Sequence, residues 1–71
     1  MNPAIQHVLQ FFAFGHLPEH LQKVSEPFFD LAQKMAAGPQ NQETTVGLRK
    51  LLEAKDCAVR ALLVKTEART S

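Results

Sequence analysis

The last third of the chain, residues 47–65, predicts a helix with apolar side chains on almost every side. A helix that buries one face against its own chain needs an apolar stripe only slightly wider than about 100°. The apolar residues of this segment cover a wider arc: Leu48, Leu51, Leu52, Ala54, Cys57, Ala58, Val59, Ala61, Leu62 and Leu63. A chain of 71 residues has too few other elements to cover them. We therefore expect copies of the chain to cover the remainder, which predicts an obligate homo-oligomer.

A chain this small usually needs disulfides, a metal or association to be stable. Its composition excludes some of these. The single cysteine, Cys57, excludes an intrachain disulfide and a cysteine-rich zinc site, and we expect it to be a buried small apolar residue. The net charge of +1 does not indicate binding to a nucleic-acid polymer. No apolar run is long enough for a membrane span, and no signal peptide is recognisable. These features predict a cytosolic protein.

Capping residues and helix breakers divide the chain into three helical segments. Asn2 and Pro3 predict the N-cap and first residue of a short helix over residues 3–14, which Gly15 ends. Asn41 predicts the N-cap of a third helix over residues 42–65. No segment alternates for long enough to form a strand. We expect an all-α fold in one domain, residues 1–71: an antiparallel helical hairpin with a short N-terminal helix.

The second helix is predicted over residues 18–37, and Pro18 opens it. Pro27 lies inside it and predicts a kink, or a break with Ser25 as a new cap. Gly38, in the left-handed conformation, and Pro39 should end this helix. The apolar residues follow a heptad spacing that predicts the packed face: Leu17, Leu21, Val24, Phe28, Leu31 and Met35.

A narrow polar stripe interrupts the apolar surface of the third helix. Arg49 and Glu53, and then Asp56 and Arg60, form opposite-charge pairs at i,i+4 spacing, each worth about 0.2–0.5 kcal/mol when exposed. The stripe is either a solvated face or the wall of a polar channel or pocket in an oligomer. Lys55 stands in an apolar row, and its stem can lie along the core while the ammonium reaches an edge. We take this placement as an indication of an anion site.

Candidates for chemistry are few, and none predicts an enzyme. His16 and His20 lie one helical turn apart, but no third metal ligand is evident, so surface, anion-contact and base roles stay open. No nucleophile motif and no glycine-rich phosphate loop occurs. We therefore expect no catalysis, no metal and no cofactor. Phe14, next to Gly15, is the best candidate for stacking on a nucleobase, which contributes about 1–3 kcal/mol in single-strand binders.

Two blocks of sequence, FGHLPEHLQKVSEPFFDLA and TVGLRKLLEAKDCAVRALL, resemble a family of short proteins from phages of actinobacteria. Those proteins in turn resemble the helical-hairpin domain of phage cyclic-oligonucleotide sponges, which counter the CBASS and Thoeris defences. The first likeness rests on HLPEHLQ and LRKLLEAKD. The second rests on the spacing from Phe14 to Leu17 and on a pattern of arginine, leucine and alanine in the last helix. Together the likeness covers about residues 11–63.

The resemblance implies a compact homo-oligomer, a hexamer, in the cytoplasm of the host. Such proteins bind cyclic di- or trinucleotides between subunits without cleaving them, and so lower the free concentration of an immune messenger. Phe14 stands where the family commonly has a stacking tyrosine, and Pro27 to Phe29 replace a stretch that carries a lysine. The implied ligand-binding residues are Phe14, His16, Arg49, Lys55 and Arg60.

Two other functions stay open on the sequence. A small helical interaction module would inhibit or tether a host or phage protein, with the phenylalanine-rich N-terminal segment as its anchor in a groove. An accessory structural protein would bind no ligand.

Overall fold

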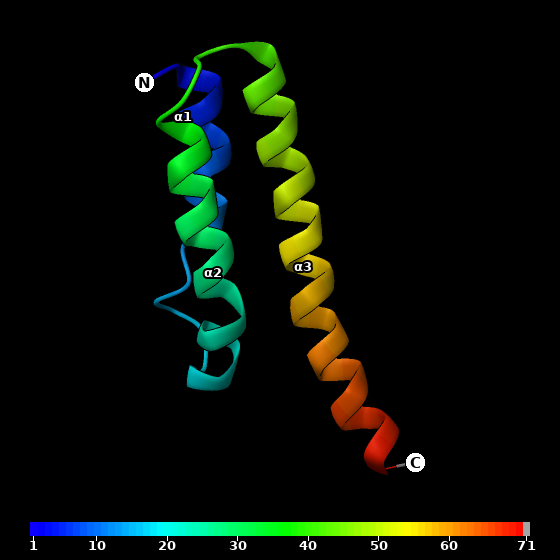
Figure 1. Cartoon of the computed structure of the whole chain (residues 1–71). Coiled ribbons are helices and arrows are strands. Elements are labelled where there is room, and N and C mark those ends of the chain that lie inside the picture. The colour runs from blue at the N-terminus through cyan, green and yellow to red at the C-terminus, as the bar shows by residue number, and fades with distance from the viewer. Residues whose placement is uncertain (71) are drawn as a thin grey trace.

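The computed structural model describes the backbone of residues 1–70 and the side chains of residues 1–64. Its elements are α1 (Pro3–Leu9), the 3-10 turn η1 (Gln10–Phe12), α2 (Glu19–Ala36) and α3 (Gln42–Thr70). No strand occurs among the residues that the structure describes, so the all-α prediction is confirmed. The chain turns back after α2, and α3 then lies along α2 while α1 lies beside both (Figure 1).

The helix starts are those that the capping residues predicted. The Asn2 Oδ1 accepts the Ala4 N–H at 2.8 Å, with Pro3 in the first turn of α1. The Asn41 Oδ1 accepts the Thr44 N–H at 3.0 Å at the start of α3. Each bond satisfies one of the N–H groups that a helix start leaves unpaired.

The helix ends differ from the prediction. The first α-helix stops at Leu9 and tightens into η1, so that Ala13 and Phe14 lie outside it. α3 continues to Thr70, five residues beyond the predicted end at 65. α2 runs through Pro27 as one helix, and the alternative of a break capped by Ser25 is therefore wrong.

The left-handed glycine predicted after α2 is also absent, because none of the chain's three glycines has a positive φ. The last carbonyl groups of α2 are satisfied in another way. The Gln40 Nε2 donates to Ala36 O at 2.7 Å and to Gly38 O at 2.9 Å. Gly38 N–H donates to Met35 O at 3.1 Å. A side chain thus supplies donors that a left-handed C-cap would otherwise provide.

The core lies where α1 and η1 meet the C-terminal half of α2 and the start of α3. Its fully buried members are Ile5, Val8, Phe12, Ala32, Ala36 and Leu48. α2 therefore turns small residues inward, and Leu31 of the predicted heptad face is instead 47 % exposed. Small side chains let helix axes approach closely. At Gly47 of α3, an added Cβ would lie 3.0 Å from the Met35 Cε, so glycine makes room for this contact.

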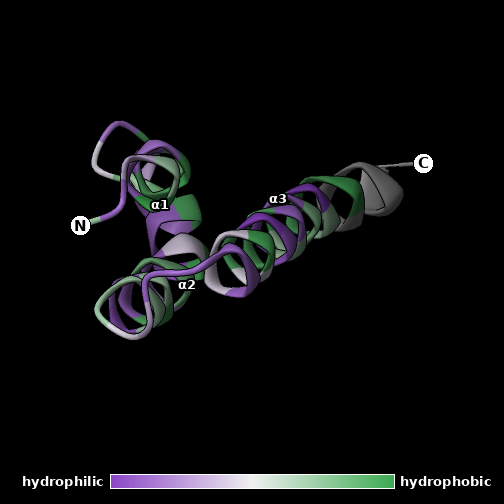
Figure 2. Cartoon of the chain, turned by 90° about the horizontal axis from the view of Figure 1, so that it is seen from above, coloured by the Kyte–Doolittle hydropathy of each residue, from purple (hydrophilic) through white to green (hydrophobic). Residues whose placement is uncertain are grey.

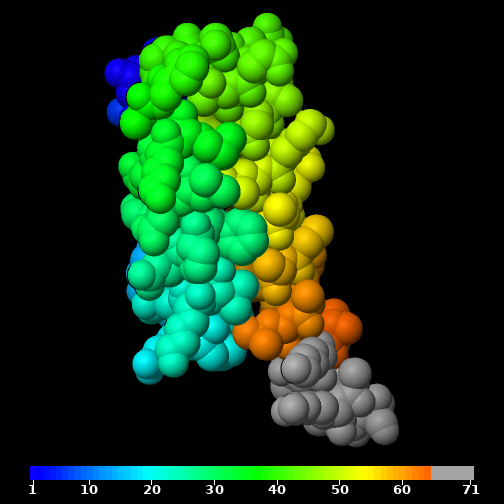
Figure 3. All heavy atoms as spheres, viewed as in Figure 1, coloured from blue at the N-terminus to red at the C-terminus, as the bar shows by residue number. Residues whose placement is uncertain are grey.

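Burial along α3 falls sharply after its second turn. Thr45 and Leu48 are buried, whereas every described side chain from residue 49 to residue 64 is partly or fully exposed. Cys57 is exposed, which overturns the prediction that it is a buried apolar residue. α2 lies alongside the described part of α3 (Figures 1 and 3), but the other helices cover only one side of it: Leu51 and Leu52 pack partly buried against the core and Lys55 contacts η1, whereas Cys57 is left exposed.

The molecule is elongated as a consequence. Its principal extents are 46 × 20 × 15 Å, and α3 reaches away from the other two helices when seen from above (Figure 2). The radius of gyration is 13.7 Å. A compact domain of this length would have a radius of gyration of about 11 Å. One copy of the chain therefore does not enclose its longest helix.

Candidate ligand-binding site

The predicted site residues lie in separate parts of a single chain. Phe14 and His16 belong to the loop between η1 and α2, whereas Arg49, Lys55 and Arg60 lie on α3. At 100° per residue, Arg49 and Arg60 project within about 20° of each other and about 16 Å apart along the axis. Lys55 projects about 120° away from Arg49 around the helix. One chain therefore does not bring the five residues together.

The loop that carries Phe14 is fixed by contacts with α2. The rings of Phe14 and Phe29 meet edge to face, with centroids 5.3 Å apart and planes at 71°. The Gln22 Nε2 donates to Leu17 O at 2.7 Å and to Gly15 O at 3.4 Å. Phe14 remains half-buried, so that part of its surface is accessible to a flat ligand. An aromatic ring held in this way is suited to stacking.

His16 lies in the same loop and is exposed. His20 follows in the first turn of α2 and is also exposed. Within residues 1–64 no group of three histidine, cysteine, aspartate or glutamate side chains is placed to hold a metal ion.

Lys55 has a structural contact that the sequence analysis missed. Its side chain is only 12 % exposed, and its Nζ donates to Phe11 O at 3.0 Å. The Asp56 Oδ1 lies 3.3 Å from the same Nζ. The ammonium thus satisfies a carbonyl of η1 and attaches that turn to α3. The sequence signal was a lysine in an apolar row, and its role as an anion contact stays a prediction.

The predicted ion pairs along α3 do not form among the described side chains. Asp56 pairs with Lys55, and the Arg60 Nη2 donates instead to the Cys57 Sγ at 3.4 Å. Arg49 and Glu53 make no ion pair. Lys55 is adjacent to Asp56 and is held in place by the Phe11 carbonyl, which explains why it takes the carboxylate. In the part of the chain with described side chains, both arginines therefore lack a carboxylate partner.

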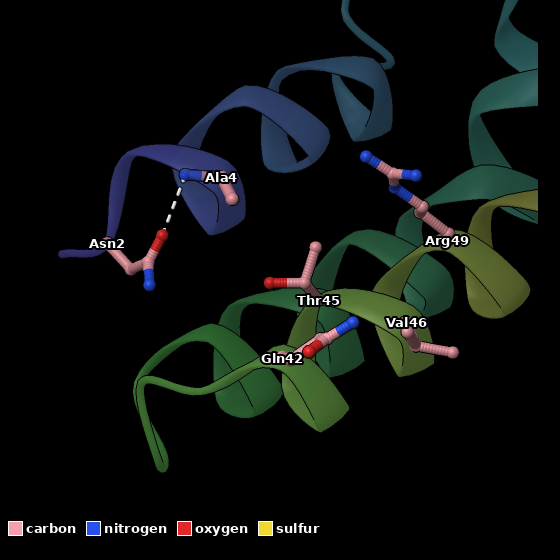
Figure 4. Close-up of a pocket in the computed structure, with 6 residues that line it drawn as sticks. All are labelled: Asn2, Ala4, Gln42, Thr45, Val46 and Arg49. Carbon is pink, nitrogen blue, oxygen red and sulfur yellow. Dashed lines mark hydrogen bonds between the residues drawn. The ribbon is translucent and has the colours of Figure 1, made fainter.

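A cavity of about 320 Å³ lies between the start of α1 and the first turns of α3 (Figure 4). We call it the Arg49 cavity. The residues that line it are Asn2, Ala4, Gln42, Thr45, Val46 and Arg49. Arg49 is the one charged residue of this lining, and its guanidinium extends toward α1 in Figure 4. The sequence predicted Arg49 as a ligand contact but missed the cavity, because local patterns do not show that α1 lies against α3.

Hydrogen bonds hold the walls of the Arg49 cavity in place. Asn2 N–H donates to the Gln40 Oε1 at 2.8 Å, which ties α1 to the loop after α2. The Thr45 hydroxyl donates to Asn41 O at 3.4 Å. The Asn2 Nδ2, the Gln42 amide and the Arg49 guanidinium have no hydrogen-bond partner among the described residues. The cavity therefore presents free donors and one positive charge, a combination that suits an oxyanion.

Compared with known proteins, the chain matches no family model, no curated protein and no solved structure. None of the helices in the described part combines the length and apolarity needed to cross a bilayer. What the site can do follows from the side chains of residues 1–64: one fixed aromatic ring, two arginines without a carboxylate partner among these residues, and apolar surface that these residues leave exposed.

Proposed function

We propose that this protein is a phage immune-evasion sponge. It forms a homo-oligomer in the host cytoplasm, binds a cyclic oligonucleotide or related nucleotide messenger of bacterial defence, and holds the messenger without cleaving it. The observation that carries the proposal is the incomplete covering of α3 beyond Leu48, on a helix that also bears Arg49 and Arg60. The identity of the messenger class follows the resemblance of residues 11–63 to phage sponges.

Self-association is supported by large apolar side chains that the described part of the chain leaves about half exposed. Leu31 is 47 % exposed on α2. On α3, Leu63 is 43 % and Val64 is 59 % exposed. Burial of apolar surface contributes roughly 25 cal/mol per Å². A standard interface takes about 800 Å² from each copy, about a sixth of the 4952 Å² surface, so the chain can form more than one.

Assembly also supplies what a nucleotide site needs and one chain lacks. A cyclic dinucleotide carries two phosphates and two flat bases, which call for cations and stacking surfaces in pairs. Symmetric copies give each residue of a site twice. Phe14 would stack on a base, and Arg49 or Arg60 would bind a phosphate through the two donors of the guanidinium edge. In the hexamer that the resemblance implies, Lys55 and His16 complete the contacts from neighbouring copies.

The side chains support binding over catalysis. The Ser25 hydroxyl is buried, and it has no partner among the described residues. Cys57 contacts Arg60 and no base. Neither is therefore arranged as an activated nucleophile, which needs an adjacent base.

A thermal-shift screen with cyclic di- and trinucleotides, their linear counterparts and ADP-ribose derivatives tests the proposal. A ligand at one hundred times its Kd adds about 2.7 kcal/mol to stability and raises the Tm. We expect a cyclic nucleotide to do so and to be recovered intact after denaturation. Phe14→Leu should weaken binding, because it removes the ring but keeps the apolar contact. The matched variant Phe11→Leu should bind as the wild type does. Hydrolysis of the ligand, or equal binding by both variants, would contradict the proposal.

The second candidate is a helical interaction module, and one observation favours it. Phe11 is half-exposed at the end of the N-terminal segment, and the His7 ring meets it edge to face at 5.5 Å and 84°. An exposed aromatic anchor of this kind fits a groove on another protein. This alternative predicts that no nucleotide raises the Tm and that Phe11→Leu, rather than Phe14→Leu, abolishes the function.

A further inference from the structure

The geometry points to a second binding site that is complete within one chain: the Arg49 cavity binds the phosphate group of a small phosphorylated molecule. The site goes beyond the proposed function, because it needs neither Phe14 nor a second copy of the chain, although Arg49 is also one of the two arginines proposed to bind the messenger. Its walls come from α1 and α3 alone, as Figure 4 shows.

The charge and the donors of the cavity select an anion. Arg49 has no carboxylate within ion-pair distance among the described side chains, including Glu53 one turn further along α3. Its planar guanidinium can give two parallel N–H bonds to a phosphate. The Asn2 Nδ2 and the Gln42 amide add neutral donors from the two opposite walls. The lining has no aspartate or glutamate that would repel the ligand.

The size and the remaining surface select a small molecule. The cavity of about 320 Å³ lies at the lower end of the range of about 300–1,000 Å³ that small-ligand pockets occupy. A phosphate alone would leave part of this space empty. Ala4 and Val46 offer apolar surface beside the donors, on which a short organic group can rest. A phosphomonoester therefore fits the cavity better than a free phosphate ion does.

The site is preorganised and separate from the aromatic loop. Because Asn2 is bonded to Gln40, and Gln40 to the end of α2, the α1 wall does not have to be ordered when a ligand arrives. Ligands lose less affinity to ordering costs at such sites. Ala4 stands in the first turn of α1, and Phe14 lies beyond the end of η1, at the other end of the segment.

Titration of the full chain by amide-resolved NMR tests the inference. The probes are ribose 5-phosphate and inorganic phosphate, with sodium chloride at equal ionic strength as the reference for screening. We expect ribose 5-phosphate to move the amide signals of Ala4, Thr45 and Arg49 saturably, and to bind more tightly than inorganic phosphate. Arg49→Gln should weaken this binding at least about tenfold, since two charge-assisted bonds are lost. The matched control is Lys50→Gln, an exposed neighbour outside the lining, which should leave binding unchanged.

Three results would overturn the inference. They are shifts that chloride reproduces, equal binding by Arg49→Gln and the wild type, and binding of inorganic phosphate without a preference for the phosphomonoester. Because Arg49 is also a proposed messenger contact, the probe distinguishes the two proposals: ribose 5-phosphate tests the Arg49 cavity, and cyclic nucleotides test the site shared between copies. If ribose 5-phosphate binds the wild type but not Arg49→Gln, the inference holds even when no cyclic nucleotide raises the Tm. If a cyclic nucleotide raises the Tm but ribose 5-phosphate does not bind, the inference is wrong and the proposed function is not affected.

Discussion

The two parts of α3 differ in both their sequences and their surroundings. Residues 42–48 contact α1 and α2 and include the buried Thr45 and Leu48. Residues 49–64 are richer in leucine and alanine, at seven of sixteen positions against one of seven, yet none of them is buried within one copy. The difference lies in how much of the helix the chain covers: α1 and α2 both contact the first part, whereas the second part has Leu51, Leu52 and Lys55 against the rest of the chain and its other side exposed. The first part is therefore stabilised by the chain itself, and we propose that the second is stabilised by copies.

Phe12→Ala should have the largest effect on the free energy of unfolding. It removes a buried ring from the core that packs against residues 42–48 of α3. Phe12 is 0 % exposed, and truncation of such a ring costs about 3–5 kcal/mol. That is comparable to the whole stability of a small domain. Circular dichroism during urea unfolding should show loss of the cooperative transition. Phe11→Ala, at a neighbour that is 51 % exposed, is the control and should cost less than about 1 kcal/mol.

Leu63→Asp should weaken association through residues 49–64 of α3 and leave the contacts within the single chain unchanged. Leu63 is 43 % exposed in one copy, so aspartate is harmless there, but in an assembly it would place a charge in an apolar contact. We expect a loss of about 2–3 kcal/mol of association per copy. Light scattering after size exclusion should show smaller particles. Gln33→Asp adds the same charge at an exposed polar position of α2, and equal dissociation by both variants would contradict an interface at Leu63.

Lys55→Met tests the hydrogen bond that attaches η1 to the second part of α3, residues 49–64. The methionine keeps much of the stem, but it leaves Phe11 O without the donor that now lies at 3.0 Å. We expect a loss of about 1–2 kcal/mol in the free energy of unfolding by urea. Lys50→Met, at an exposed lysine with no such bond, should change stability by no more than about 0.5 kcal/mol. An equal loss in both variants would show that Lys55 does not attach η1 to α3.

Ser25→Ala should have the smallest effect, and in the stabilising direction. The Ser25 Oγ is buried and has no partner among the described residues, so its removal relieves a desolvation cost. We expect a gain of about 0.5–1 kcal/mol in thermal unfolding. Thr45→Val is the opposite case, because the Thr45 hydroxyl has a partner in Asn41 O, and it should lose stability. A loss for Ser25→Ala would mean that the hydroxyl has a partner in the assembly.

The parts of the fold that depend on neighbouring residues could be predicted from the sequence. Capping by Asn2 and Asn41 involves residues two and three positions away, and both caps are present. The packed face of α2 was predicted in part: Leu21 is buried and Phe28 and Met35 pack against the core, whereas Leu31 is 47 % exposed. Spacing reveals an apolar row such as that of Leu31, but it does not tell whether the same chain covers that row or the small-residue row of Ala32.

The candidate site was less predictable for the same reason. Arg49 and Lys55 were singled out by their positions on an apolar helix. The acceptor of Lys55 is Phe11 O, 44 residues away, and no local pattern identifies it. The Arg49 cavity likewise requires that the start of α1 lie against α3. Such contacts depend on the angle between helices, which is set by packing over the whole chain.

Sedimentation velocity of the wild-type chain at micromolar concentration tests the central claim most directly. The account predicts a particle whose mass is a multiple of the 7.9 kDa chain, sixfold in the proposed hexamer. Its dissociation on dilution should be accompanied by loss of helix. A well-folded single copy of 7.9 kDa at that concentration would contradict the account.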